Sequence, residues 1–163
     1  MIVTRHLTLT PPEEKTIPQV VRWLNDKDLM KYSEQRHLTH HDDTQRVYIM
    51  MMHEPHKYME IHYGKAVIGT ISAHVDVNDV ANVGILVGER GCWGRGLGTE
   101  AWQAFCDHLL GNGIRKIEAG CMEVNFGMIH IFRKTGMQYE GRRHAHFLVG
   151  EDTVDEVMYG RFT

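Results

Sequence analysis

Five glycines fall between residues 88 and 98, directly before a stretch of helix-forming residues. A glycine-rich turn that leads into a helix exposes unpaired backbone N–H groups at the positive end of the helix dipole. Turns of this kind bind phosphate groups. The first chemistry that the sequence indicates is therefore the binding of a phosphate-bearing ligand.

The spacing of these glycines discriminates between two families of nucleotide-binding proteins. A P-loop needs Lys followed by Ser or Thr, but Leu97 and Gly98 stand there. A dinucleotide fingerprint begins correctly with Gly94 and Gly96, but Thr99 replaces its third glycine. The P-loop is excluded, and a dinucleotide-binding protein is kept as an alternative.

Histidine is the other residue type that could do chemistry, because imidazole can accept a proton near neutral pH. The chain has 12 histidines, so the number alone favours solvent-facing roles for most of them. His144 and His146 share one face of an expected strand, and His74 lies in an expected strand in the middle of the chain. The pairs His53/His56 and His144/His146 lack a third ligand at a convincing spacing, so we expect no metal.

The elements that must position these residues follow from hydrophobic periodicity and turn residues. Their order is β, α, α, β, β, β, α, β, α, β, β, which predicts an α+β sheet with helices packed on it. The expected strands are 2–9, 58–63, 66–77, 81–88, 114–123, 137–149 and 153–162, the expected helices are 17–26, 42–52, 99–111 and 125–136, and 30–41 is an expected loop or broken helix.

Length and composition limit the partners and the compartment. With 163 residues and 42% hydrophobic content, the chain predicts one domain. A net charge of -3 favours neither nucleic acid nor a membrane as a partner. Cys92, Cys106 and Cys121 have no C-x-x-C spacing, and the first residues form no apolar signal segment, so we expect a cytoplasmic protein.

Four segments resemble the GNAT superfamily of N-acetyltransferases. Residues 93–98, WGRGLG, resemble the [RQ]-x-x-G-x-[GA] loop that binds acetyl-CoA, although Trp93 replaces Arg or Gln. That departure resembles the branch that acetylates ribosomal-protein N-termini and amino sugars. Residues 125–137 resemble the N-x-x-[AS]-x-x-x-[YF]-x-K-x-G-F segment, and the opening and closing segments also resemble that branch. The resemblance covers nearly the whole chain.

This resemblance implies one N-acetyltransferase domain over residues 1–163, with a mixed, mostly antiparallel sheet of about six to seven strands. Helices would cover both faces, and the two central strands would splay. It implies acetyl-CoA as the donor and direct transfer in a ternary complex to a primary amine, on a small molecule such as an amino sugar or at a protein N-terminus. A homodimer is an open expectation. The residues implied to bind the cofactor are Ile85, Leu86, Val87, Trp93, Gly94, Arg95, Gly96, Leu97, Gly98, Thr99, Asn125 and Phe132.

The acid and base are not the residues that the family commonly uses. Asn82 stands where the resemblance places a carboxylate base, and Phe132 stands where it often places a tyrosine acid. His144 and His146 lie near the position of a catalytic glutamate in a related branch. Alternatively, no protein base is needed, because holding the free amine beside the thioester would supply most of the rate. A catalytically weak acyl-CoA-binding module is therefore an alternative. The residues implied to contact the acceptor are Tyr32, Glu34, Arg36 and His37.

Overall fold

The fold is an eight-stranded sheet between two pairs of helices, in a computed structural model that describes residues 1–163. The strand order is β1-β2-β3-β4-β5-β6-β8-β7. The strands are β1 (Ile2–Val3), β2 (Leu7–Thr10), β3 (Lys57–Tyr63), β4 (Ala66–Val75), β5 (Val80–Val87), β6 (Lys116–Met122), β7 (Gln138–Val149) and β8 (Asp152–Phe162). The helices are α1 (Ile17–Leu24), α2 (Asp42–Met51), α3 (Leu97–Gly111) and α4 (Phe126–Lys134), with short 3-10 turns η1 (Glu14–Thr16) and η2 (Arg90–Cys92).

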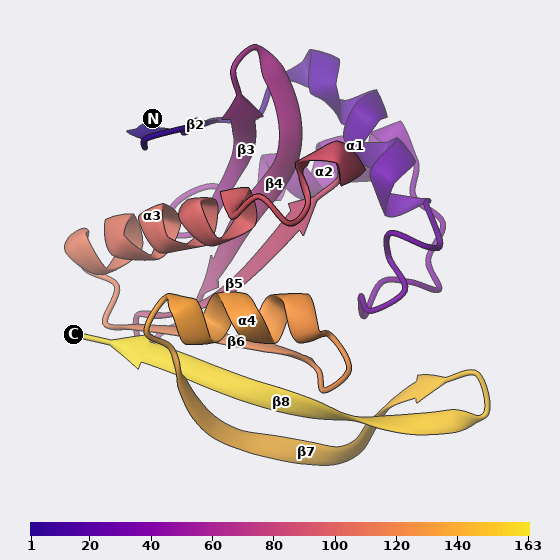
Figure 1. The fold of residues 1–163 in the computed structure, drawn as a ribbon. Coiled ribbons are helices and arrows are strands. Elements are labelled where there is room, and N and C mark those ends of the chain that lie inside the picture. Colours follow the sequence, from indigo (N-terminus) through magenta and orange to yellow (C-terminus); the bar gives the residue numbers. More distant parts are fainter.

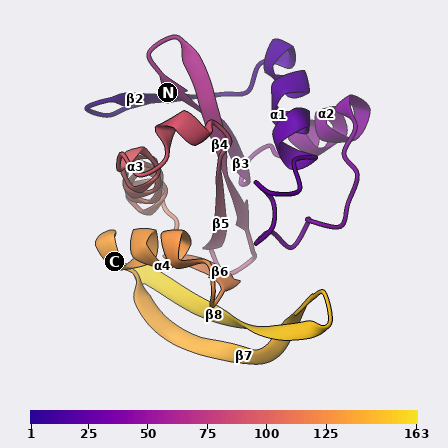
Figure 2. The ribbon, with the colours of Figure 1, turned by 45° about the vertical axis from the view of Figure 1, so that its right-hand side comes forward.

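The helices cover both faces of the sheet, as predicted. Helices α3 and α4 lie on one face, and α1 and α2 lie on the other (Figure 2). The β7–β8 hairpin forms a long curved ribbon at the end of the sheet (Figure 1). None of the helices combines the length and the hydropathy needed to cross a membrane.

The predicted central splay is present between β5 and β6. These two strands are the one parallel pair in an otherwise antiparallel sheet. Their pairing stops at Asn82↔Glu118, although β5 continues to Val87 and β6 continues to Met122. Beyond that point each strand keeps only its outer neighbour, so the facing edges are open.

The hydrophobic core lies between the sheet and α3. The apolar stripe that predicted this helix is buried, with Phe105 and Cys106 fully inaccessible and Trp102 1% exposed. Its partners are alternate residues of the strands, such as Ile61 and Ile117, both 0% exposed. Period-two burial in the strands and helical-period burial in α3 therefore meet in one cluster.

One sequence prediction of the elements needs correction. The expected single strand 2–9 is a hairpin of β1 and β2, because Thr4 forms a turn: its N–H donates to the Leu7 carbonyl at 2.9 Å, and its Oγ1 accepts the Leu7 N–H at 2.9 Å. The sheet therefore has eight strands.

Candidate functional site

The glycine turn ends at the N-terminus of α3 in a form suited to an anion. Gly94 and Gly96 have φ of 71° and 77°, in the left-handed region that favours glycine. The first helical hydrogen bond joins the Glu100 N–H to the Gly96 carbonyl at 3.0 Å, and no side chain caps the helix. The N–H groups of the first turn are therefore available at the positive end of the dipole.

Two of the three glycines of this turn are required by their backbone conformation. A β-carbon at Gly94 or Gly96 would meet no protein atom within 4 Å, so the backbone conformation requires glycine there. At Gly98 a β-carbon would lie 3.4 Å from Ile131 Cδ1 and 3.5 Å from Val87 Cγ2. Both distances are ordinary van der Waals contacts, so the packing of α3 does not require glycine at position 98.

Side chains hold the turn in place from outside. Arg90 pairs with Asp26 at 3.0 Å and with Asp28 at 3.3 Å, which connects the turn to the segment after α1. The Trp93 indole N–H donates to the Val87 carbonyl at 2.9 Å. Arg95 turns away from the cavity and donates to the Tyr63 hydroxyl at 2.8 Å. Arg95 can therefore contribute its backbone to an anion site, whereas its side chain is committed elsewhere.

Substituting Trp93 with phenylalanine tests whether the indole hydrogen bond holds the turn for its ligand. The ring that Arg90 covers at 5.7 Å is kept, and the N–H that bonds Val87 is lost. A neutral hydrogen bond contributes about 0.5–1.5 kcal/mol, so the affinity for coenzyme A should fall about two- to tenfold. Calorimetric titration measures this change, and an unchanged dissociation constant would show that the bond does not order the turn.

The open edge of β5 offers main-chain groups at alternate residues. The Gly88 N–H donates to the Ile68 carbonyl on the β4 side at 2.8 Å. Hydrogen-bonded pairs recur at every second residue of an antiparallel ladder, so the main-chain groups of Leu86 are bonded to Thr70 of β4. Ile85 therefore presents both of its main-chain groups to the splay, and Val87 presents its N–H, because the Val87 carbonyl already accepts the Trp93 indole N–H. Of the three β5 residues implied to bind the cofactor, Leu86 therefore has no main-chain group free to pair with it.

One large cavity of about 1290 Å³ connects the turn, the splay and the segment between α1 and α2. It brings together most of the predicted residues. Those that line it are Tyr32, Glu34, Asn82, Ile85, Leu86, Val87, Trp93, Gly94, Gly96, Leu97, Gly98, Thr99, Asn125 and Phe132. Those that do not are Arg36, His37, Arg95, His144 and His146.

Asn125 and Phe132 reach this cavity from α4. Asn125 caps the helix by accepting the Met128 N–H at 3.2 Å on its Oδ1. Phe132 is 0% exposed and packs against Trp102 and Tyr159, with ring centroids 5.5 Å and 4.9 Å away. Phe132 therefore belongs to the core and forms part of the cavity wall.

The predicted acceptor residues divide into two groups. Tyr32 and Glu34 line the cavity, whereas His37 is exposed outside it. Arg36 donates to the Ser33 carbonyl at 3.0 Å and to the Leu148 carbonyl on β7. The guanidinium of Arg36 therefore fastens the segment between α1 and α2 to β7 and lies outside the cavity, away from the predicted acceptor contact.

The predicted proton carriers also lie in different surroundings. His144 is highly exposed and pairs with Asp155 at 3.1 Å, away from the cavity. His146 lies at the cavity edge, with its Nε2 atom 3.6 Å from Oε2 of the buried Glu156. Asn82 is beside Glu118, with 3.5 Å between Nδ2 and Oε1. Of the two histidines on β7, only His146 is near the cavity.

Three residues that the sequence did not point to as site residues line the same cavity: Glu118, Glu156 and His74. The two glutamates come from β6 and β8, and only strand pairing brings them to the splay. His74 accepts or donates a hydrogen bond with the Tyr48 hydroxyl at 3.0 Å. Burial and the neighbouring His56 lower the pKa of His74, which favours the neutral imidazole.

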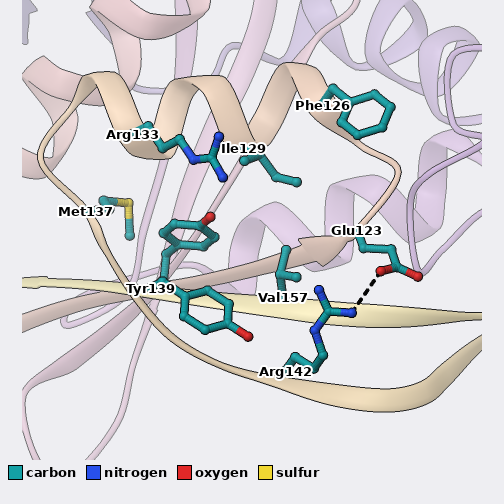
Figure 3. Close-up of a pocket in the computed structure, with 9 residues that line it drawn as sticks. Glu123, Phe126, Ile129, Arg133, Met137, Tyr139, Arg142 and Val157 are labelled. Carbon is teal, nitrogen blue, oxygen red and sulfur yellow. Dashed lines mark hydrogen bonds and ion pairs between the residues drawn. The ribbon is translucent and has the colours of Figure 1, made fainter.

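A smaller hollow of about 550 Å³ lies between α4 and β7 (Figure 3). Phe126, Ile129 and Arg133 face it from α4. On the opposite side, Arg142 pairs with Glu123 at 3.0 Å, so its charge is already compensated. No residue of the predicted site lines this hollow, and the larger cavity is the candidate site.

Comparisons with known proteins agree with this geometry. A family model described as an acetyltransferase (GNAT) domain matches residues 6–138. No curated protein sequence matches the chain.

Solved structures share the whole fold at low sequence identity. The RimL ribosomal L7/L12 alpha-N-protein acetyltransferase, in complex with coenzyme A, is 20% identical with a TM-score of 0.87 over 98% of this chain and 96% of its own. The spermidine N-acetyltransferase from Vibrio cholerae, with coenzyme A and spermine, is 17% identical with a TM-score of 0.86 over 98% and 96%. The microcin C7 self-immunity acetyltransferase MccE, with acetyl-CoA and AMP, is 18% identical with a TM-score of 0.83 over 98% and 94%.

Proposed function

Because the chain belongs to the GNAT acetyltransferase family, we propose that it transfers the acetyl group of acetyl-CoA directly to a primary amine in the large cavity. As a member of this family, the protein is an acyltransferase with acetyl-CoA as its donor. The acceptor in this proposal is a small-molecule amine, such as an amino sugar, or a protein N-terminus.

The observation that carries the proposal is the continuity of the cavity. The uncapped start of α3 supports binding of the pyrophosphate, and the open edge of β5 supports pairing with the pantetheine arm. The same cavity continues to Tyr32 and Glu34 on the acceptor side. Donor and acceptor would therefore meet at the splay, beside Asn82 and Glu118.

The two buried cysteines support direct transfer. Cys121 lines the cavity, but burial raises the pKa of its thiol to about 12. Burial raises the pKa of Cys106 to about 12 as well. A thiol with such a pKa is not a nucleophile at neutral pH, because the thiolate is the reactive form. The three free cysteines also support our placing the enzyme in the reducing cytoplasm.

The reaction then needs little from acid and base groups. The amine nitrogen attacks the thioester carbonyl carbon, the carbon–sulfur bond breaks, and the proton lost by the amine balances the proton gained by the thiolate. His146 is the proton acceptor that we propose, because it is the β7 histidine near the cavity. Holding amine and thioester together supplies most of the remaining rate.

An amine panel tests the function. Acetyl-CoA is incubated with the protein and glucosamine, spermidine or a short peptide with a free N-terminal serine, and free thiol is measured. We expect at least one amine to accelerate thiol release well above the amine-free control. Binding of acetyl-CoA without release on any amine would instead support the acyl-CoA-binding module.

Thermal denaturation separates the remaining alternative. Acetyl-CoA and coenzyme A should raise the melting temperature, because a ligand of the folded state stabilises it by mass action. Stabilisation by NAD alone would contradict the proposal and support a dinucleotide-binding protein.

A further inference from the structure

Three side chains from separate parts of the chain meet on the acceptor side of the cavity. Glu34 comes from the segment between α1 and α2, His146 from β7 and Glu156 from β8. One ligand atom from each lies within 4.8 Å of the others. We call these residues the acceptor cluster. Because Glu34 and Glu156 line the large cavity, the cluster faces the space where an acceptor would lie.

Glu156 has an unsatisfied, buried oxygen. Its side chain is 9% exposed, and its Oε2 atom accepts no hydrogen bond. Room for the carboxylate comes from Gly120, where a β-carbon would lie 2.5 Å from Glu156 Oε1. A buried carboxylate oxygen without a hydrogen bond is costly, so a partner is expected at Oε2.

The charges around Oε2 select the kind of partner. Arg143 Nη1 lies 3.3 Å away and His146 Nε2 lies 3.6 Å away. Two carboxylates, Glu34 and Glu156, face the one guanidinium of Arg143, which leaves one uncompensated negative charge. A single positive charge balances it. A divalent ion would face repulsion from Arg143 at close range.

We propose that the acceptor cluster binds the ammonium group of the acceptor, which makes the preferred substrate an amine that is cationic at neutral pH. Glu34 and Glu156 accept hydrogen bonds from the ammonium, and this supplies the missing partner of Oε2. His146 contacts the same group and is placed to take its proton. This inference rests on the proposed acetyl transfer and defines its acceptor.

Substitution of Glu156 with glutamine tests the cluster, with Glu140→Gln as the matched control. Glu140 lines the same cavity, but its carboxylate is already paired with Lys116 at 2.7 Å. Hydrogen bonds to charged groups are strong, so the KM for the best cationic amine of the panel should rise about tenfold or more in Glu156→Gln. Glu34→Gln should raise it in the same direction. Glu140→Gln should leave the KM unchanged, and all three should keep the wild-type affinity for acetyl-CoA.

A neutral acceptor separates charge recognition from a merely structural effect. An alkoxyamine is uncharged at neutral pH, so Glu156→Gln should leave its KM nearly unchanged. Equal losses with charged and neutral amines, or an unchanged KM with both, would overturn the inference while the wild-type activity still supported acetyl transfer. Activity of the wild type that EDTA abolishes and a divalent metal restores would also overturn it, in favour of a metal site. Absence of turnover in the wild type with every amine would instead contradict the proposed function.

Discussion

Replacing Gly96 with aspartate is expected to lower the affinity for acetyl-CoA about a hundredfold while the protein stays folded. A carboxylate a few ångströms from a phosphate costs several kcal/mol at the effective dielectric of a protein surface, and about 1.4 kcal/mol corresponds to tenfold. Aspartate at this helix-capping position would also compete with the anion, because its carboxylate would accept hydrogen bonds from the same N–H groups. Calorimetric titration with acetyl-CoA measures the loss.

The fold should survive this substitution because two effects oppose each other. The left-handed φ of 77° costs a non-glycine residue about 1–2 kcal/mol, and a new cap returns about 1 kcal/mol. Gly91→Asp is the matched control, because Gly91 lies outside the cavity and a β-carbon there meets no atom within 4 Å. If Gly96→Asp binds acetyl-CoA as the wild type does, the turn is not the pyrophosphate site.

The second large effect concerns stability. Phe132→Ala should lower the free energy of unfolding by about 3–5 kcal/mol, because it leaves a cavity between Trp102 and Tyr159 in the core. Urea denaturation measures the difference. Phe126→Ala on the same helix is the control, since Phe126 is 75% exposed and its loss should change stability by no more than about 0.5 kcal/mol. Similar losses for both variants would contradict this assignment of the core.

The donor side of the site could be predicted because its signals are local. The left-handed conformations of Gly94 and Gly96 belong to one short turn, which its glycines indicate. The apolar stripe of α3 follows from helical spacing alone. The splay and the helices on both faces came from the family resemblance. The predicted number of strands was too low, because a turn as short as the one at Thr4 leaves little trace in a β-rich stretch.

The acceptor side could not be predicted in the same way, because its contacts join distant parts of the chain. Arg36 looked like a substrate ligand, and it is held by a carbonyl 112 residues away. Glu156 reaches the splay only because β8 pairs with β6 and Gly120 leaves room for its carboxylate. In a regular strand, His144 and His146 would lie on the same face, because one residue separates them. Ala145, however, has φ of 50°, and the irregular pairing of β7 places the two histidines in different surroundings.

The most direct test of the central claim follows the acetyl group itself. Acetyl-CoA labelled in its acetyl group is mixed with the protein and the most active amine of the panel, and amine and protein are both examined by mass spectrometry after one turnover. We predict the label on the amine nitrogen, with free coenzyme A in equal amount and no label on the protein. Label bound to the protein, or thiol release without an N-acetyl product, would contradict direct transfer in the cavity.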